Sequence, residues 1–207
     1  MFTDDKAPQT KGAVPVRIGF MLFDGVEELD IVGPWEVFAL LERMGTPLQR
    51  FTLGPQAGWV RASGGLRLGV DYAWDEAPSP DWLIVPGGPA VRPEPPKPLV
   101  DWVERTAPGI SVIASVCTGS FVLAEAGLLD GRRATTNHGW LDVFRQRYPR
   151  VDVVADDVVP GERIWTAGAI ASGIPLALAL VRQHWGVEQA EAVARRLNYR
   201  IPLPGGS

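Results

Sequence analysis

The stretch Ile110–Gly127, ISVIASVCTGSFVLAEAG, decides the fold of this 207-residue chain. Its opening ISVIASV is a continuous apolar run, which predicts a strand buried on both faces. The residues from Gly119 to Ala126 predict a helix, and Gly127 is a usual residue just beyond a helix C-terminus. A buried strand that leads directly into a helix is typical of a parallel sheet covered by helices.

The rest of the chain repeats this alternation of short apolar strands and amphipathic helices. Pro34 stands where a first helical residue belongs, so we expect a helix from Pro34 with its cap at Gly33. Gly64-Gly65 between two extended pieces indicates a hairpin over 59–72, and the five prolines of 89–98 indicate a loop. The other predicted strands cover 14–23, 50–53, 82–85, 151–154 and 163–166, and the other helices cover 99–106, 140–148, 173–183 and 187–197.

This pattern predicts an α/β three-layer sandwich: a mostly parallel sheet with helices on both faces, as in flavodoxin-like folds. We expect one domain over 14–201, a loosely attached tail over 1–13 and a frayed end over 202–207. With 46% hydrophobic and 21% charged residues, the composition is that of an ordinary globular domain.

Composition also excludes several classes of function. The formal net charge of −4 argues against a nucleic-acid partner or an anionic membrane. One cysteine excludes an internal disulfide and, with two histidines, a Cys/His zinc site. No phosphate-loop or dinucleotide fingerprint occurs. The chain shows neither a secretory signal nor an apolar run of membrane-spanning length, which predicts a cytoplasmic protein.

Cys117 lies on the sharp turn between the predicted strand and helix of the opening stretch. Its sulfur would sit at a helix N-terminus, where unpaired N–H groups and the helix dipole favour the thiolate. A lone cysteine can equally be a small buried hydrophobe. Position alone leaves the nucleophile and the core residue as equal alternatives.

A nucleophilic thiol needs an acid or base beside it. His184 is expected at a helix C-terminus, where it would interact with the last carbonyl groups. His138 could face the same crevice as Cys117 or lie in a surface loop. Asp30 is the better candidate, because it lies between apolar neighbours just before the helix expected at Pro34. Its neighbours Glu27 and Glu28 are expected to be solvated.

Taken together, these segments resemble the ThiJ/PfpI family of the class I glutamine amidotransferase-like superfamily, and within it the isocyanide hydratases. The resemblance runs from about Val16 to Tyr199. Its motifs are Glu28-Leu29-Asp30 with Gly33-Pro34, Val85-Pro86-Gly87-Gly88, Ser115-Val116-Cys117-Thr118-Gly119-Ser120, Ala134-Thr135-Thr136, and Trp165-Thr166-Ala167-Gly168 leading into Ser172-Gly173-Ile174.

The resemblance implies that Cys117 is a nucleophile, that Asp30 is its general acid and base, and that Thr118 positions Asp30 or a water. Gly87 and Gly88 would face developing negative charge. Asn137 and His138 are expected to help bind the substrate. The implied reaction adds water to an isocyanide through a Cys117 thioimidate, without a metal or a cofactor. The resemblance also implies a homodimer, whose expected partner is a small-molecule substrate.

Two departures from the family pattern affect this expectation. Asn137 stands where many relatives carry histidine twenty residues after the cysteine, which disfavours a Cys–His pair and favours a thiol assisted by Asp30. Pro175 stands where relatives often carry aspartate. A glyoxalase- or deglycase-like enzyme acting on α-oxoaldehydes stays an alternative, because other members of the superfamily have this activity. That chemistry relies on a glutamate and usually a histidine, so Asp30 and Asn137 count against it.

A non-enzymatic alternative also stays open. The domain is similar to the ligand-sensing half of AraC-type regulators. Because Ser207 leaves no room for a DNA-binding module, that reading predicts a stand-alone ligand or redox sensor.

Overall fold

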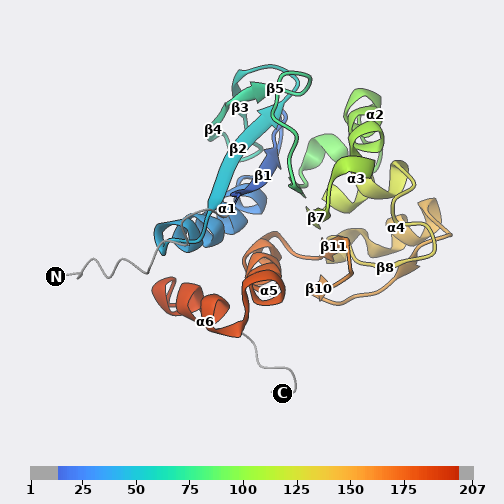
Figure 1. Cartoon of the computed structure of the whole chain (residues 1–207). Coiled ribbons are helices and arrows are strands. Elements are labelled where there is room, and N and C mark those ends of the chain that lie inside the picture. The colour runs from blue at the N-terminus through green and yellow to red at the C-terminus, as the bar shows by residue number, and fades with distance from the viewer. Residues whose placement is uncertain (1–13, 201–207) are drawn as a thin grey trace.

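The computed structural model describes residues 14–200, and the structural statements below concern that part of the chain. It forms three layers, with helices on both faces of a seven-stranded sheet (Figure 1). The predicted α/β class is therefore confirmed. The expected tail over 1–13 and the frayed end over 202–207 lie outside the described residues, so the predicted domain limits stay predictions.

The central sheet has the strand order β10-β11-β7-β6-β1-β2-β5. Its neighbouring strands pair in parallel, except that β10 at one edge runs antiparallel to β11. All five residues of β7 are buried, as its apolar sequence predicts. The strands are β1 (Val16–Met21), β2 (Leu48–Gly54), β5 (Tyr72–Ala73), β6 (Trp82–Val85), β7 (Val112–Val116), β10 (Val158–Val159) and β11 (Ile164–Ala167).

Two small sheets flank the main one. The predicted hairpin is present as β3 (Gly58–Arg61) paired antiparallel with β4 (Arg67–Val70). A short parallel pair joins β8 (Arg133–Ala134) to β9 (Asp152–Val153).

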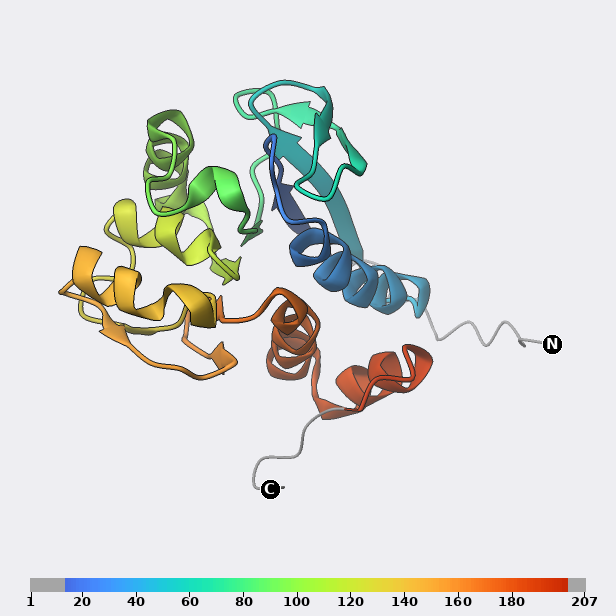
Figure 2. The same cartoon turned by 180° about the vertical axis from the view of Figure 1, so that it is seen from behind.

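The helices divide between the two faces of the sheet, and Figure 2 shows the division from behind. On one face lie α1 (Glu28–Arg43), α5 (Gly173–Trp185) and α6 (Val187–Arg196), which pack against one another. On the other lie α2 (Lys97–Thr106), α3 (Gly119–Glu125) and α4 (Leu141–Arg147). No helix among residues 14–200 is long and apolar enough to cross a bilayer.

Helix α1 begins six residues before the predicted start. Its first residue is Glu28, and Pro34 lies inside it. The prediction at Pro34 was wrong because proline is common in the first turn of a helix, whereas here it stands in the second. Pro34 has no N–H, so it cannot donate to the carbonyl group of Asp30, four residues earlier. Because α1 begins at Glu28, Asp30 belongs to the first turn of the helix and not to the connection before it.

The predicted loop over 89–98 is also shorter than expected. A 3₁₀ turn forms over Pro89–Val91, and α2 begins at Lys97. Prolines tolerate the first turn of a helix, which is why a proline-rich segment can begin one.

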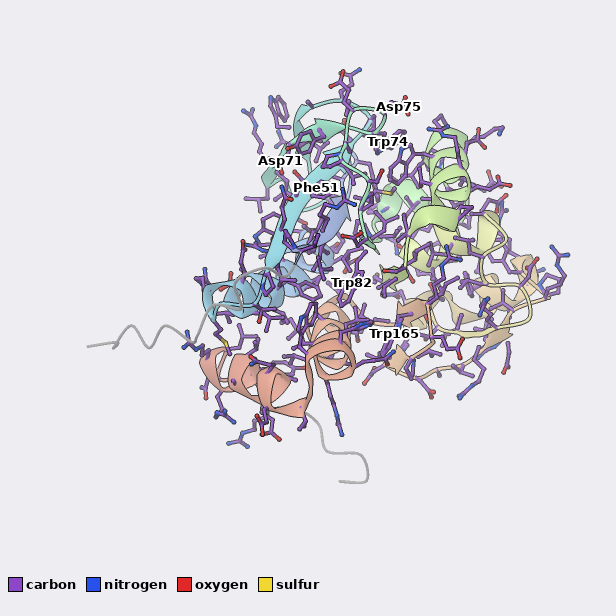
Figure 3. The ribbon with its side chains drawn as sticks, viewed as in Figure 1. Phe51, Asp71, Trp74, Asp75, Trp82 and Trp165 are labelled. Atoms are coloured by element: carbon purple, nitrogen blue, oxygen red, sulfur yellow. The ribbon has the colours of Figure 1, made fainter. Side chains whose placement is uncertain are left out.

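His184 takes part in an aromatic cluster on the α5 face. Trp82, labelled in Figure 3, is the first residue of β6, and its ring centroid lies 4.5 Å from that of His184. Trp185 lies beside them, 5.1 Å from Trp82. Burial lowers the pKa of His184. Because the cluster lies at the amino-terminal end of β6, His184 is remote from the opposite edge, where β7 ends at Val116.

Candidate active site

Cys117 directly follows β7 and has a φ of +55°, in the left-handed region that favours glycine. Such a conformation costs a non-glycine residue about 1–2 kcal/mol. Its N–H donates to the carbonyl oxygen of Ala167 at the end of β11 (2.8 Å). Thr136 and Ser120 each place a hydroxyl 3.3 Å from the carbonyl oxygen of Cys117. The strained turn is thus held from three directions, which is typical of functional residues.

Three glycines let the surrounding backbone close on this turn. A Cβ at Gly119 would run into the carbonyl oxygen of Val85. Gly88 has a φ of +141°, and a Cβ there would run into the carbonyl oxygen of Gly25. A Cβ at Gly87 would lie 2.5 Å from both the amide nitrogen and the Oγ1 of Thr118. Backbone segments after β6 and β7 are therefore in direct contact.

We expect Gly87→Ala to destabilise the protein by about 2–4 kcal/mol, because the added methyl group meets backbone atoms that cannot move alone. Urea unfolding measures the change. Gly109→Ala is the matched control, since a Cβ at Gly109 meets nothing within 4 Å. Equal stability of the two variants would contradict this packing argument.

Asp30 is completely buried beside the turn. Its Oδ2 accepts a hydrogen bond of 2.8 Å from the Gly87 amide, and its Oδ1 has no hydrogen-bond partner in the described structure. Burial raises the pKa of Asp30 to about 8, against the lowering effect of the Gly87 amide, with Glu27 adding to the rise and the Cys117 thiol opposing it. The side chain is therefore a neutral carboxylic acid at neutral pH.

Cys117 is also a neutral thiol in this setting, with 5% of its surface exposed. Burial and the nearby Asp30 raise the pKa of Cys117 to about 11, although Asn137 and Thr118 donate hydrogen bonds that favour the thiolate. The expectation that the helix N-terminus yields a thiolate is wrong for this state, because desolvation outweighs those donors. At neutral pH, thiol and carboxylic acid lie next to each other.

Asn137 lies against the sulfur, with its Nδ2 3.3 Å from Sγ of Cys117. Its Oδ1 accepts from the amide of Gly139, which fixes the side chain so that the amide group faces the thiol. His138 points elsewhere: its Nε2 is 3.8 Å from a carboxylate oxygen of Asp157, and nearly half of the side chain is exposed. Of the two neighbours, Asn137 contacts the sulfur, and His138 lies at the margin.

The amides of the two glycines after β6 each donate a hydrogen bond to a buried side chain. Gly88 donates its N–H to Oγ1 of Thr118 (3.0 Å), as Gly87 donates to Asp30. Both amides therefore already have hydrogen-bond acceptors, the carboxyl group of Asp30 and the hydroxyl group of Thr118. In this arrangement neither is free to stabilise negative charge, and that role stays a prediction.

Sequence reasoning missed the supporting threonines. Thr135 and Thr136 are fully buried, and the amide of Thr135 donates to Oγ1 of Thr166 (2.9 Å). The signal was available, because two consecutive threonines inside an otherwise buried segment require internal hydrogen-bond partners. They tie the segment carrying Asn137 to β11 and to the Cys117 turn.

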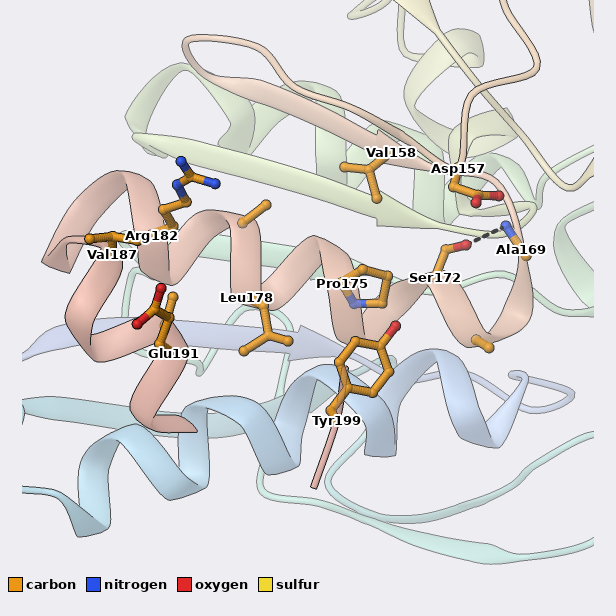
Figure 4. Close-up of a pocket in the computed structure, with 13 residues that line it drawn as sticks. Asp157, Val158, Ala169, Ser172, Pro175, Leu178, Arg182, Val187, Glu191 and Tyr199 are labelled. Carbon is orange, nitrogen blue, oxygen red and sulfur yellow. Dashed lines mark hydrogen bonds between the residues drawn. The ribbon is translucent and has the colours of Figure 1, made fainter. Parts of the chain in front are cut away.

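A cavity of about 690 Å³ lies near this region, and Cys117 is not among its lining residues. It runs along α5 and is covered by α6 and Tyr199 (Figure 4). Pro175 lies in its wall and contributes an apolar surface. Among residues 14–200, no group of three or more histidine, cysteine or acidic side chains could hold a metal ion.

The chain is similar in sequence and in fold to known proteins. The DJ-1/PfpI family model matches residues 16–183. The chain is 36% identical over 192 residues to an isonitrile hydratase from Pseudomonas putida, covering 91% of this chain and 80% of that protein. A ThiJ/PfpI family protein from Pseudomonas syringae has a similar solved structure, with a TM-score of 0.81 at 20% identity, covering 98% of this chain and 86% of that one.

A transcriptional regulator is also similar. The chain is 34% identical over 183 residues to the HTH-type transcriptional regulator CdhR of Pseudomonas aeruginosa, covering 86% of this chain. It spans about half of that relative, 53% of its length.

Proposed function

Since the chain belongs to the DJ-1/PfpI family, we propose that it is a cysteine hydratase that adds water to an isocyanide and releases an N-substituted formamide. It needs neither metal nor organic cofactor for this chemistry. The proposal extends to a cytoplasmic homodimer, in line with the expectations from the sequence.

One observation carries the proposal: a buried carboxyl group and a buried thiol share one site, and burial raises the pKa of each, which makes the ionised carboxylate a stronger base towards the thiol. An isocyanide carbon must receive both a nucleophile and a proton. A thiol next to a carboxyl group can supply both, because the carboxyl group passes the thiol proton to the carbon that the sulfur attacks.

In the first step, the Asp30 carboxylate takes the proton of the Cys117 thiol, and the sulfur forms a bond to the isocyanide carbon. Asp30 then donates that proton to the same carbon. The product is a thioimidate, in which the former isocyanide carbon is bonded to sulfur, hydrogen and nitrogen. Asn137 supports this step because its amide N–H faces the sulfur and stabilises negative charge there.

In the second step, Asp30 takes a proton from a water molecule whose oxygen bonds to the thioimidate carbon. The proton passes to the substrate nitrogen. The carbon–sulfur bond then breaks as the carbonyl group forms, and the hydroxyl proton returns to sulfur through Asp30. The products are the formamide and the original thiol, so atoms and charge balance.

This scheme predicts a pH dependence. Asp30 must be ionised to accept the thiol proton, and its pKa is raised to about 8 by burial. We expect kcat/KM to fall about tenfold per pH unit below pH 8. Turnover of an aryl isocyanide from pH 6 to 9, corrected for spontaneous hydrolysis, measures the profile. A flat profile between pH 6 and 8 would contradict this role of Asp30.

The proposal is tested by product analysis. The protein is mixed with an aryl isocyanide, and formamide is followed by chromatography while the protein is quenched in acid for mass spectrometry. We expect formamide and a transient Cys117 adduct of the substrate's mass. Formation of lactate from methylglyoxal, with no isocyanide turnover, would favour the α-oxoaldehyde alternative.

A ligand or redox sensor is the second candidate, supported by the similarity to a transcriptional regulator. Its marker is a stable sulfinic acid at Cys117 that alters binding to a partner. Peroxide treatment followed by mass spectrometry detects this product. Rapid isocyanide turnover by the untreated protein would count against the sensor.

A further inference from the structure

The tip of the β3–β4 hairpin, residues 62–66, contacts the segment that leads into α1. The amide of Ser63 donates to the carbonyl oxygen of Val26 (2.8 Å). The amide of Gly25 donates to the carbonyl oxygen of Arg61 (2.7 Å). The hairpin belongs to a separate small sheet. These bonds therefore join a peripheral element to the segment that delivers Asp30.

Glu28, the first residue of α1, is the side chain that spans this junction. Its Oε1 accepts from the Leu66 amide (3.4 Å), and its Oε2 accepts from the hydroxyl of Ser63 (3.3 Å). The Ser63 hydroxyl also lies 3.0 Å from Oε2 of Glu27. Glu27 and Glu28 are partly exposed, and both contact the hairpin tip.

Gly64 makes this contact possible. A Cβ at Gly64 would lie 2.5 Å from Oε1 of Glu28, so any larger residue displaces the carboxylate. Desolvation would raise the pKa of Glu28, but hydrogen bonds from its own backbone and from Gly64, Leu66 and Ser63 together lower that pKa. The Glu28 side chain that contacts the hairpin tip is therefore an ionised carboxylate at neutral pH.

The same segment is held on its other side by the glycines after β6. The amide of Glu27 donates to the carbonyl oxygen of Gly87 (2.9 Å), and the Gly87 amide donates to Asp30. The start of α1 is therefore fixed between the hairpin tip and Gly87. Since Glu28 and Asp30 belong to the same helical turn, displacement of one alters the placement of the other.

We propose that Glu28 is a positioning residue, which holds Asp30 in its buried place through the contact of Glu28 with the hairpin tip. This inference rests on the proposed function only for its effect on turnover. The titratable groups that act on Asp30 are Glu27 and Cys117. Glu28 acts through the backbone of the helical turn, which keeps water away from the Asp30 carboxyl group.

Gly64→Ala tests the proposal, because the added methyl group meets only the movable end of the Glu28 side chain. Gly69→Ala is the matched control in the same hairpin, since a Cβ there meets nothing within 4 Å. The readout is the ¹³C resonance of the Asp30 carboxyl carbon against pH, in protein labelled at aspartate and assigned with Asp30→Asn. It reports on Asp30 whether or not the protein turns over an isocyanide.

In Gly64→Ala we expect the Asp30 midpoint to fall by at least one pH unit, because water reaches the carboxyl group. With an isocyanide, kcat should fall about ten- to a hundredfold with little change in KM. Gly69→Ala should match the wild type in both measurements. An unchanged Asp30 midpoint in Gly64→Ala, or an equal shift in Gly69→Ala, would overturn the proposal.

A second pair of variants keeps the test decisive if Gly64→Ala folds poorly. Glu28→Gln retains an oxygen that can accept from the Leu66 amide, whereas Glu28→Ala retains nothing. We expect the Asp30 midpoint of Glu28→Gln to lie nearer the wild type than that of Glu28→Ala. Identical midpoints in the two variants would refute positioning by Glu28. Absence of turnover in the wild type would refute the proposed function alone.

Discussion

Cys117→Ala is expected to abolish formamide formation, with a loss of about 10⁴-fold or more, because no other group in the site can form the thioimidate. The fold should survive, since alanine keeps the Cβ and fits the space of the thiol. Turnover by the purified variant is measured with the same aryl isocyanide. Near-UV circular dichroism checks the fold, and retained turnover in a folded variant would contradict the covalent mechanism.

Two companion variants separate chemistry from backbone strain. Cys117→Ser should be as inactive as Cys117→Ala, because a hydroxyl beside a neutral carboxyl group is a far weaker nucleophile than a thiol. Cys117→Gly should be more stable than Cys117→Ala by about 1 kcal/mol, because the φ of +55° suits glycine. The reverse order in urea unfolding would show that the turn is not strained.

Asp30→Asn is expected to reduce turnover by about 10³-fold, since asparagine keeps the shape of the side chain and removes proton transfer. The same change should stabilise the protein at pH 8. Folding raises the pKa of Asp30 from 3.8 to about 8, so the folded state holds a proton that the unfolded state releases. Wild-type stability from this group is complete below pH 4 and is lost as the pH rises towards 8.

Urea unfolding of both proteins at pH 5 and pH 8 measures this effect. The variant should gain about 3–4 kcal/mol relative to the wild type between these two pH values. Oδ1 of Asp30 lacks a partner, so an amide at this position leaves one group unsatisfied, which lowers the stability of the variant by the same amount at both pH values. Parallel stability curves of the two proteins would contradict the raised pKa.

Much of the architecture follows from local pattern. The apolar run before Cys117 predicts a buried central strand, and Gly64-Gly65 predicts the hairpin between β3 and β4; both are present. Pro34 misled the prediction of α1, because the helix start is stabilised by contacts with residues distant in sequence. Local pattern does not contain those contacts.

In the candidate site, too, some features follow from local sequence and others depend on contacts between distant residues. Cys117, Asp30 and Asn137 do converge, as the motifs predict. The neutral state of the thiol could not be predicted, because it depends on how completely α1, β6 and β7 exclude water. The role of Glu28 was missed for a related reason: its partners lie 35 and 38 residues away in the hairpin.

The conformation of Cys117 limits how this position can evolve. β-Branched threonine tolerates a positive φ poorly, so serine is the hydroxyl nucleophile that could replace Cys117 with less strain. Glycine and asparagine, in contrast, adopt that conformation readily and carry no nucleophile. Replacement of Cys117 by glycine or asparagine therefore ends the chemistry and also relaxes the backbone. Loss of selection for catalysis would therefore permit a more stable, inactive domain.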